Sequence, residues 1–167
     1  YKRQVNDCSV KMDRRVQVDA KFQPRLCLNK WCWHHPLPQG NALLGMWGTG
    51  PSDIWAVGDG GAALHYDGQT WALQNTGTKT NLNGVYAPAA GMAVVVGDSG
   101  LVLRWNGSTF ASEPSGTLSN LNSVWGASGS NVFAVGDTGT IIRNMGSGWV
   151  PMSSGTTNNL DRVSGSA

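Results

Sequence analysis

The stretch SNVFAVGDTGTIIR, residues 130–143, decides the fold because the chain contains it three times in variant form. The earlier copies are GMAVVVGDSGLVLR at 91–104 and SDIWAVGDGGAALH at 52–65. Each copy lies 39 residues from the next, and no gap is needed to align them. A repeat period between about 20 and 50 residues predicts a solenoid, a repeat array or a propeller.

Each repeat has the pattern of four short strands separated by glycine-rich turns. In the third copy, the expected strands are 121–125, 132–135, 140–144 and 149–152. The four consecutive apolar residues at 132–135 favour a strand that is packed on both faces. Four strands in about 40 residues are typical of a β-propeller blade. We therefore predict an all-β fold built from blades of four antiparallel strands.

Two aromatic columns mark the edges of the expected blade. The innermost strand is predicted to carry Trp47, Tyr86 and Trp125, and the outermost strand Trp71, Phe110 and Trp149. Between the third and fourth strands, Asp67-Gly68 and Asn106-Gly107 have the composition of two-residue hairpin turns, in which both central residues need a positive φ. Met145-Gly146, in the third copy, departs from that composition.

The chain divides into two segments of different composition. Residues 1–42 form an N-terminal arm with all three cysteines, and eight Lys or Arg oppose three Asp before residue 41. Residues 43–167 hold the repeats and carry four basic against seven acidic residues. The repeats run over 43–81, 82–120, 121–159 and, in part, 160–167.

Both ends of the repeat region have the pattern of an incomplete blade. In the register of the repeat, residues 31–38 fall at an outermost strand, and Leu160 begins an innermost strand. Propellers usually have about four to eight blades, and closing the ring removes exposed sheet edges. We therefore expect the chain to be a fragment of a closed propeller, with the N-terminal strand completing the C-terminal blade.

The overall composition excludes several classes of protein. The 167 residues include 23 glycines, and only 13% are charged, which argues against a helical bundle or coiled coil. No apolar run approaches the ~18 residues of a membrane-spanning helix. The basic arm lacks a nucleic-acid-binding motif and the repeats are acidic, so we expect no nucleic-acid partner.

Polar residues recur at two fixed positions of the repeat. One column holds Asp59, Asp98 and Asp137, and the other holds His65, Arg104 and Arg143. The aspartates could surround one rim and bind a cation or polar ligand, whereas Asp beside Gly in a turn usually bonds its own backbone. The basic column could meet an anionic or sugar ligand, or it could be a set of solvated strand ends.

Aromatic residues that break the repeat are better candidates for ligand stacking than those that keep it, which suit a core. On this criterion the candidates are Tyr66, Trp105, Trp31 and Trp33. A separate cluster of Cys27, Cys32, His34 and His35 lacks the second ligand pair of a usual zinc module. We predict no metal and no cofactor.

The segments 53–59 and 130–143 resemble the DVWAVGDGGTILHWDG-type propeller repeats of secreted proteins and lipoproteins from gliding soil bacteria. Residues 31–41, WCWHHPLPQGN, resemble the leader of such repeats, which are also distantly similar to Asp-box repeats. The resemblance implies a secreted or cell-surface location in a bacterium. In an exported protein, Cys27 and Cys32 would form a disulfide and leave Cys8 over.

These observations favour a secreted or envelope-attached binding or scaffolding module with a protein or glycan partner. A structural subunit of an extracellular assembly or filament is the alternative. A sialidase-like glycosidase ranks third, because the segment 67–71 resembles an Asp box without its leading Ser. Glycosidases need two positioned carboxyl groups, and Glu113 is the only glutamate in the chain. We therefore predict that the protein is not an enzyme.

Overall fold

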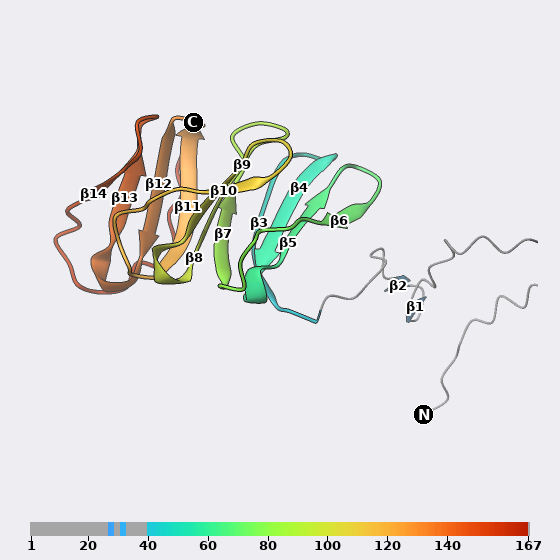
Figure 1. Cartoon of the computed structure of the whole chain (residues 1–167), viewed down its shortest axis with the longest axis horizontal. Helices are drawn as coiled ribbons and strands as arrows, with labels where there is room; N and C mark the ends of the chain where they lie inside the picture. Colours follow the sequence, from blue (N-terminus) through green and yellow to red (C-terminus); the bar gives the residue numbers. More distant parts are fainter. Residues whose placement is uncertain (1–26, 29–30, 33–39, 167) are drawn as a thin grey trace, which may run out of the picture. The chain divides into compact units, whose positions relative to one another are not determined.

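The computed structural model describes residues 27–28, 31–32 and 40–166. It confirms the predicted all-β class, because residues 43–152 form three sheets of four antiparallel strands each. The sheets follow one another along the chain (Figure 1), and we call them the first, second and third blade. The first blade contains β3 (Leu43–Gly50), β4 (Asp53–Gly58), β5 (Ala63–Tyr66) and β6 (Trp71–Leu73).

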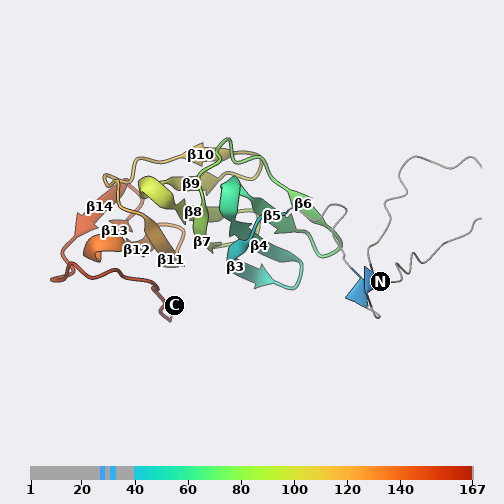
Figure 2. The same ribbon diagram turned by 90° about the horizontal axis from the view of Figure 1, so that it is seen from below.

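The other two blades repeat this arrangement. The second contains β7 (Leu82–Tyr86), β8 (Ala93–Gly97), β9 (Val102–Trp105) and β10 (Phe110–Ser112). The third contains β11 (Leu121–Ser128), β12 (Asn131–Gly136), β13 (Ile141–Asn144) and β14 (Trp149–Met152). Figure 2 shows the three sheets spread like a fan, with β3, β7 and β11 close together and β6, β10 and β14 farther out. The predicted order of inner and outer strands is therefore confirmed.

Apolar side chains on both faces of the middle strands hold the blades together. Trp55 and Val57 of β4 are fully buried against the second blade, in a core that includes Val95 of β8. From the opposite face of β8, Val94 enters the core that joins the second and third blades, where Ile142 is also buried. The consecutive apolar runs of the repeat thus serve two interfaces at once.

The GDxG segments form short 3-10 turns between the second and third strands of each blade. These turns are η1 (Asp59–Gly61), η2 (Asp98–Gly100) and η3 (Asp137–Gly139). In η2, Gly100 has a φ of 71°, and a Cβ there would lie 2.0 Å from the carbonyl oxygen of Thr117. Only glycine allows this contact between the turn and the loop that leads to the next blade.

The hairpin turns after the third strands are longer than predicted. Tyr66 pairs with Trp71, so the turn in the first blade has four residues, 67–70, not two. Gly68 has a positive φ of 95°, but Asp67 does not. The side chain of Asp67 explains this, because its Oδ1 accepts hydrogen bonds from the backbone N–H groups of Gln69 and Thr70, at 2.8 and 2.7 Å.

The segment after the third blade follows the blade without forming a strand of its own. No strand is assigned within residues 153–166, whereas an innermost strand was predicted from Leu160. Nevertheless, Leu160 accepts a bond from the side chain of Asn122 at 3.2 Å, as Leu121 does from Asn83 at 3.0 Å. Leu160 thus has the same position relative to the third blade as Leu121 has relative to the second.

The N-terminal arm is described only as a short hairpin. In it, β1 (Cys27–Leu28) pairs with β2 (Trp31–Cys32), and Cys27 lies opposite Cys32. Residues 33–39 lie outside the described part of the chain, so the outer strand expected at 31–38 stays a prediction. Within the described residues, no helix is long and apolar enough to cross a membrane.

Candidate functional site

The aspartates of the GDxG turns are held by asparagine side chains. The carboxylate of Asp98 accepts Nδ2 hydrogen bonds from Asn81 at 3.1 Å and from Asn83 at 2.9 Å. Asp137 has the equivalent pair of bonds, both 3.0 Å long. These two carboxylates bond asparagine amides, so the expectation that they bond their own backbone is corrected. In the first blade, both asparagine positions are apolar, so Asp59 lacks this pair of donors.

The same asparagines also connect one blade to the next. Oδ1 of Asn81 accepts the backbone N–H of Gly60, in the turn of the first blade, at 3.0 Å. Asn83 donates to the carbonyl oxygen of Leu121, in the third blade, at 3.0 Å. Each asparagine therefore bonds its own blade and a neighbour. This role is structural, since the hydrogen-bonding groups of these side chains face other parts of the protein.

His65 is held within the first blade. Its Nε2 lies 2.6 Å from Oδ1 of Asp53, which also accepts the hydroxyl of Thr49 through Oδ2. The imidazole stacks on the indole of Trp55, with ring centroids 4.3 Å apart and planes inclined by 21°. His65 is thus fixed by a carboxylate on one side and an aromatic face on the other.

The arginines of the same column have different partners. Arg143 donates through Nε and Nη2 to Oδ1 of Asn131, at 3.1 and 3.0 Å, and lies over the ring of Phe133. Arg104 instead forms an ion pair with Glu113, through Nε and Nη2. Each basic residue is bonded within its own blade, so the column does not converge on one ligand site.

The aromatic candidates differ in exposure. Trp105 is only 8% exposed and packs against Trp55 and Phe110 between the first two blades, so its ring is not available to stack on a ligand. The ring of Tyr66 is half-buried beside Trp71, and its hydroxyl donates to the carbonyl oxygen of Gly68 at 2.8 Å. The side chains of Trp31 and Trp33 lie outside the described part of the chain.

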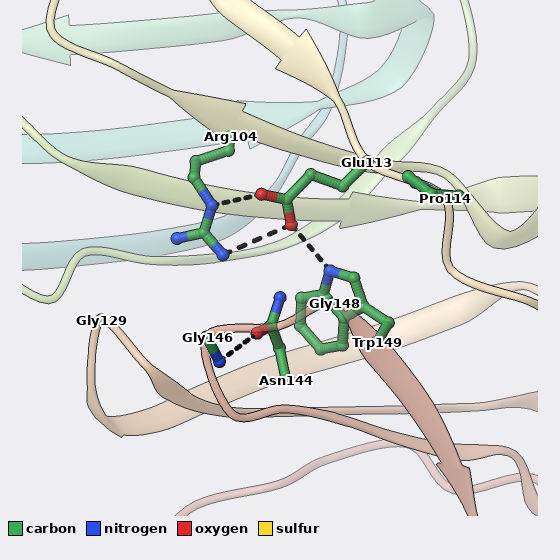
Figure 3. A pocket seen from close by; sticks show the side chains of 8 residues that line it. All are labelled: Arg104, Glu113, Pro114, Gly129, Asn144, Gly146, Gly148 and Trp149. Atoms are coloured by element: carbon green, nitrogen blue, oxygen red, sulfur yellow. Dashed lines mark hydrogen bonds and ion pairs between the residues drawn. The ribbon is translucent and has the colours of Figure 1, made fainter.

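A polar notch lies between the second and third blades. Its volume is about 340 Å³, and its lining includes Arg104, Glu113, Asn144 and Trp149. Figure 3 shows that Arg104 and Glu113 come from one side and Asn144 and Trp149 from the other. Trp149 donates its indole Nε1–H to Oε2 of Glu113 at 2.8 Å, across the interface.

The environment of Glu113 keeps it ionised. Burial raises its pKa, but hydrogen bonds from Arg104 and Trp149 and the charge of Arg104 outweigh burial, so the pKa lies below the ordinary value of 4.5. The notch therefore contains a fixed ion pair. No group of three or more His, Cys, Asp or Glu that could hold a metal occurs among the residues that the structure describes.

A second cavity, which we call the inner-strand cavity, lies along the first strands of all three blades. Its volume is about 360 Å³. Residues of β3, β7 and β11 line it together with residues 161–163, including Met46, Asn83, Asn122 and Asp161. Met46 is 66% exposed. The amides of Asn83 and Asn122 are bonded within the protein, so the cavity combines an accessible apolar side chain with the charged residues Asp161 and Arg162.

Comparisons with known proteins support the fold. No family model and no curated protein matches the chain. A structure of YCF48 bound to D1 peptide is similar to it, with a TM-score of 0.62, 17% identity, and coverage of 74% of this chain and 43% of that one. YCF48 from Cyanidioschyzon merolae is also similar, with a TM-score of 0.59, 20% identity, and coverage of 72% and 42%.

These similarities give the three sheets their place in a known architecture. YCF48 is a seven-bladed β-propeller, and the chain matches part of it. The chain spans less than half of the length of either YCF48 structure. The three sheets therefore resemble consecutive blades of a propeller.

Proposed function

We propose that the protein is a binding module, secreted or attached to the cell surface of a bacterium, whose partner is an extended segment of another protein. The observation that carries this proposal is the inner-strand cavity. Apolar contacts with Met46 would bury surface, while the charged side chains of Asp161 and Arg162 in the lining would bond a polypeptide backbone.

One further observation supports a protein partner, and a second argues against a glycosidase. One of the similar YCF48 structures contains a bound peptide, so a fold of this kind accommodates one. In addition, Glu113, which is the only glutamate, is neutralised by Arg104 and bonded to Trp149. A carboxylate in that state lacks the raised pKa of a glycosidase acid. The location rests on the resemblance to exported bacterial repeats.

The experiment starts with a selection of random linear peptides on the immobilised full chain. The selected peptide is then synthesised and titrated calorimetrically into the wild type and into Met46→Glu. We expect the substitution to weaken binding at least about tenfold, because it places a charge in the apolar part of the cavity. A glycan array tested in parallel measures the competing ligand class.

Leu118→Glu is the matched control. Leu118 is an 87% exposed apolar residue between the second and third blades, outside both the inner-strand cavity and the notch. We expect this variant to bind the peptide within twofold of the wild type. Equal losses in the two variants, the absence of any selected peptide, or specific binding of glycans alone would each overturn the proposal. Urea unfolding of both variants verifies that they are folded.

A further inference from the structure

The notch between the second and third blades has the chemistry of a binding site that the inner-strand cavity does not provide. We infer that it binds the side-chain carboxamide of an asparagine or glutamine. The source of this carboxamide, a protein segment, rests on the proposed function. The notch itself shares no lining residue with the inner-strand cavity.

The side chain of one largely buried asparagine, Asn144, faces the notch. Asn144 is only 5% exposed, although it lines the notch at the end of β13. Its Oδ1 accepts the backbone N–H of Gly146 at 2.7 Å, which fixes the orientation of the amide. Its Nδ2 then points toward the open space near Arg104 (Figure 3), and no protein acceptor for it is found among the described residues. This amide donor is open to the notch and can donate to an oxygen ligand that enters it.

Arg104 has N–H donors that its ion pair with Glu113 does not use. A guanidinium group has five N–H donors in a rigid plane, and the ion pair with Glu113 uses two of them. The ion pair holds that plane in place at the edge of the notch (Figure 3). The donors of Arg104 and Asn144 therefore come from two different blades toward one small space of about 340 Å³. A carbonyl oxygen that enters this space can accept from both donors.

The charge of the notch excludes a carboxylate ligand. Arg104 is already paired with Glu113, so the pair as a whole is neutral. A carboxylate ligand beside Arg104 would also approach the ionised Glu113 and be repelled. A carboxamide has no charge, and its NH₂ group can donate to the same glutamate while its oxygen accepts. The notch thus distinguishes glutamine from glutamate by the charge of Glu113.

The lining of the notch favours a protein side chain over the acetamido group of a sugar. Proteins that bind sugars commonly stack the ring on an accessible aromatic face. In the notch, the only aromatic residue of the lining is Trp149, and it is 9% exposed because its ring packs into the core between the second and third blades. The notch offers hydrogen-bonding groups without a stacking platform.

The test uses small probes and the full chain. The probes are the N-acetyl methylamides of glutamine and glutamate, which differ in the side-chain end group, and N-acetylglucosamine as the sugar. Binding is followed by the NMR signal of the Trp149 indole N–H, which is assigned by its loss in Trp149→Phe. We expect the wild type to bind the glutamine probe about tenfold more tightly than the glutamate probe.

Two conservative variants separate recognition from folding. Asn144→Asp keeps an acceptor for Gly146 but removes the Nδ2 donor, so the affinity for the glutamine probe should fall about tenfold. Glu113→Gln keeps an acceptor for Trp149 but removes the negative charge, so the two probes should bind within threefold of each other. Urea unfolding shows whether each variant is folded.

Three results would overturn the inference. These are equal binding of the two probes by the wild type, an unchanged affinity of Asn144→Asp for the glutamine probe, and tighter binding of N-acetylglucosamine than of glutamine. Met46→Glu, which alters the inner-strand cavity, should leave probe binding unchanged. A failure at the notch is therefore distinguishable from a failure of the proposed function, which is measured at Met46.

Discussion

The side-chain amide of Asn120 donates to the carboxylate of Asp137 at 3.0 Å, and its Oδ1 accepts the backbone N–H of Ser99 at 2.9 Å. Asp137 belongs to the third blade, whereas Ser99 lies in the turn of the second. One asparagine thus joins two blades near their inner strands. Bonds of this kind to a charged group contribute about 1.5–3 kcal/mol to stability.

We predict that Asp98→Ala destabilises the protein by about 2 kcal/mol, because it leaves the amides of Asn81 and Asn83 without their acceptor. The matched control is Asp59→Ala in the first blade, where Ala42 and Leu44 occupy the asparagine positions. Its cost should stay below about 1 kcal/mol. Urea unfolding of the two variants measures the difference. Equal costs would show that the asparagine pair is not what stabilises the turn.

Two glycines allow the cost of a left-handed backbone conformation to be measured separately from the cost of a steric clash. Gly100 and Gly116 have nearly the same φ, 71° and 75°. A Cβ on Gly100 would lie 2.0 Å from the carbonyl oxygen of Thr117, whereas a Cβ on Gly116 would meet no atom within 4 Å. We expect Gly116→Ala to cost about 1–2 kcal/mol from the left-handed conformation alone. Gly100→Ala should cost clearly more in thermal or urea unfolding; a similar cost would contradict the close approach.

The repeat made the blades predictable from the sequence, because a strand buried on both faces has a local signature. The run 132–135 is apolar at every position and lies within the observed strand β12. The turns were predicted less well than the strands, because in a turn a side chain can form hydrogen bonds that backbone groups form elsewhere. The turn at 67–70 is longer than expected because Asp67 bonds two backbone N–H groups, and these bonds lower the pKa of its carboxyl group.

The candidate site was less predictable, because it depends on contacts between blades. Glu113 and Trp149 meet across 36 residues of sequence, and no local pattern links them. Trp105 was a candidate for ligand stacking because it breaks the repeat, yet the structure buries it. One signal was available: the Asn-Leu-Asn triplet at 81–83 recurs at 120–122, in register with the Asp of each GDxG turn.

The N-terminal arm holds two cysteines whose oxidation state can be predicted. Cys27 and Cys32 are paired residues of the β1–β2 hairpin, and the resemblance to exported repeats implies an oxidising environment. We expect the two cysteines to form a disulfide in protein isolated from its natural source. Peptide mapping with and without a reductant measures it, since reduction adds about two hydrogen masses to the linked peptide. Two free thiols, or a pairing of either cysteine with Cys8, would contradict the prediction.

The ion pair of Glu113 and Arg104 should make the stability of the folded protein depend on pH. The pKa of Glu113 in the folded protein lies below its ordinary value of 4.5, because the bonds and charge of its partners outweigh the opposing effect of burial. An acid with a lowered pKa stabilises the folded state above its unfolded pKa and loses that contribution as the pH falls through the folded pKa. The contribution of Glu113 should therefore be complete at pH 7.

Unfolding by urea at pH 7, 5 and 3 measures this contribution as the difference between the wild type and Glu113→Gln. We expect the wild type to be the more stable protein at pH 7 and at pH 5. The difference should shrink at pH 3, which lies below the ordinary pKa of 4.5, because the contribution is lost as the pH falls toward the lowered pKa of the folded state. Glutamine keeps the shape and one acceptor, so the comparison isolates the charge. A difference that stays constant from pH 7 to pH 3 would show that the ion pair does not stabilise the interface between the blades.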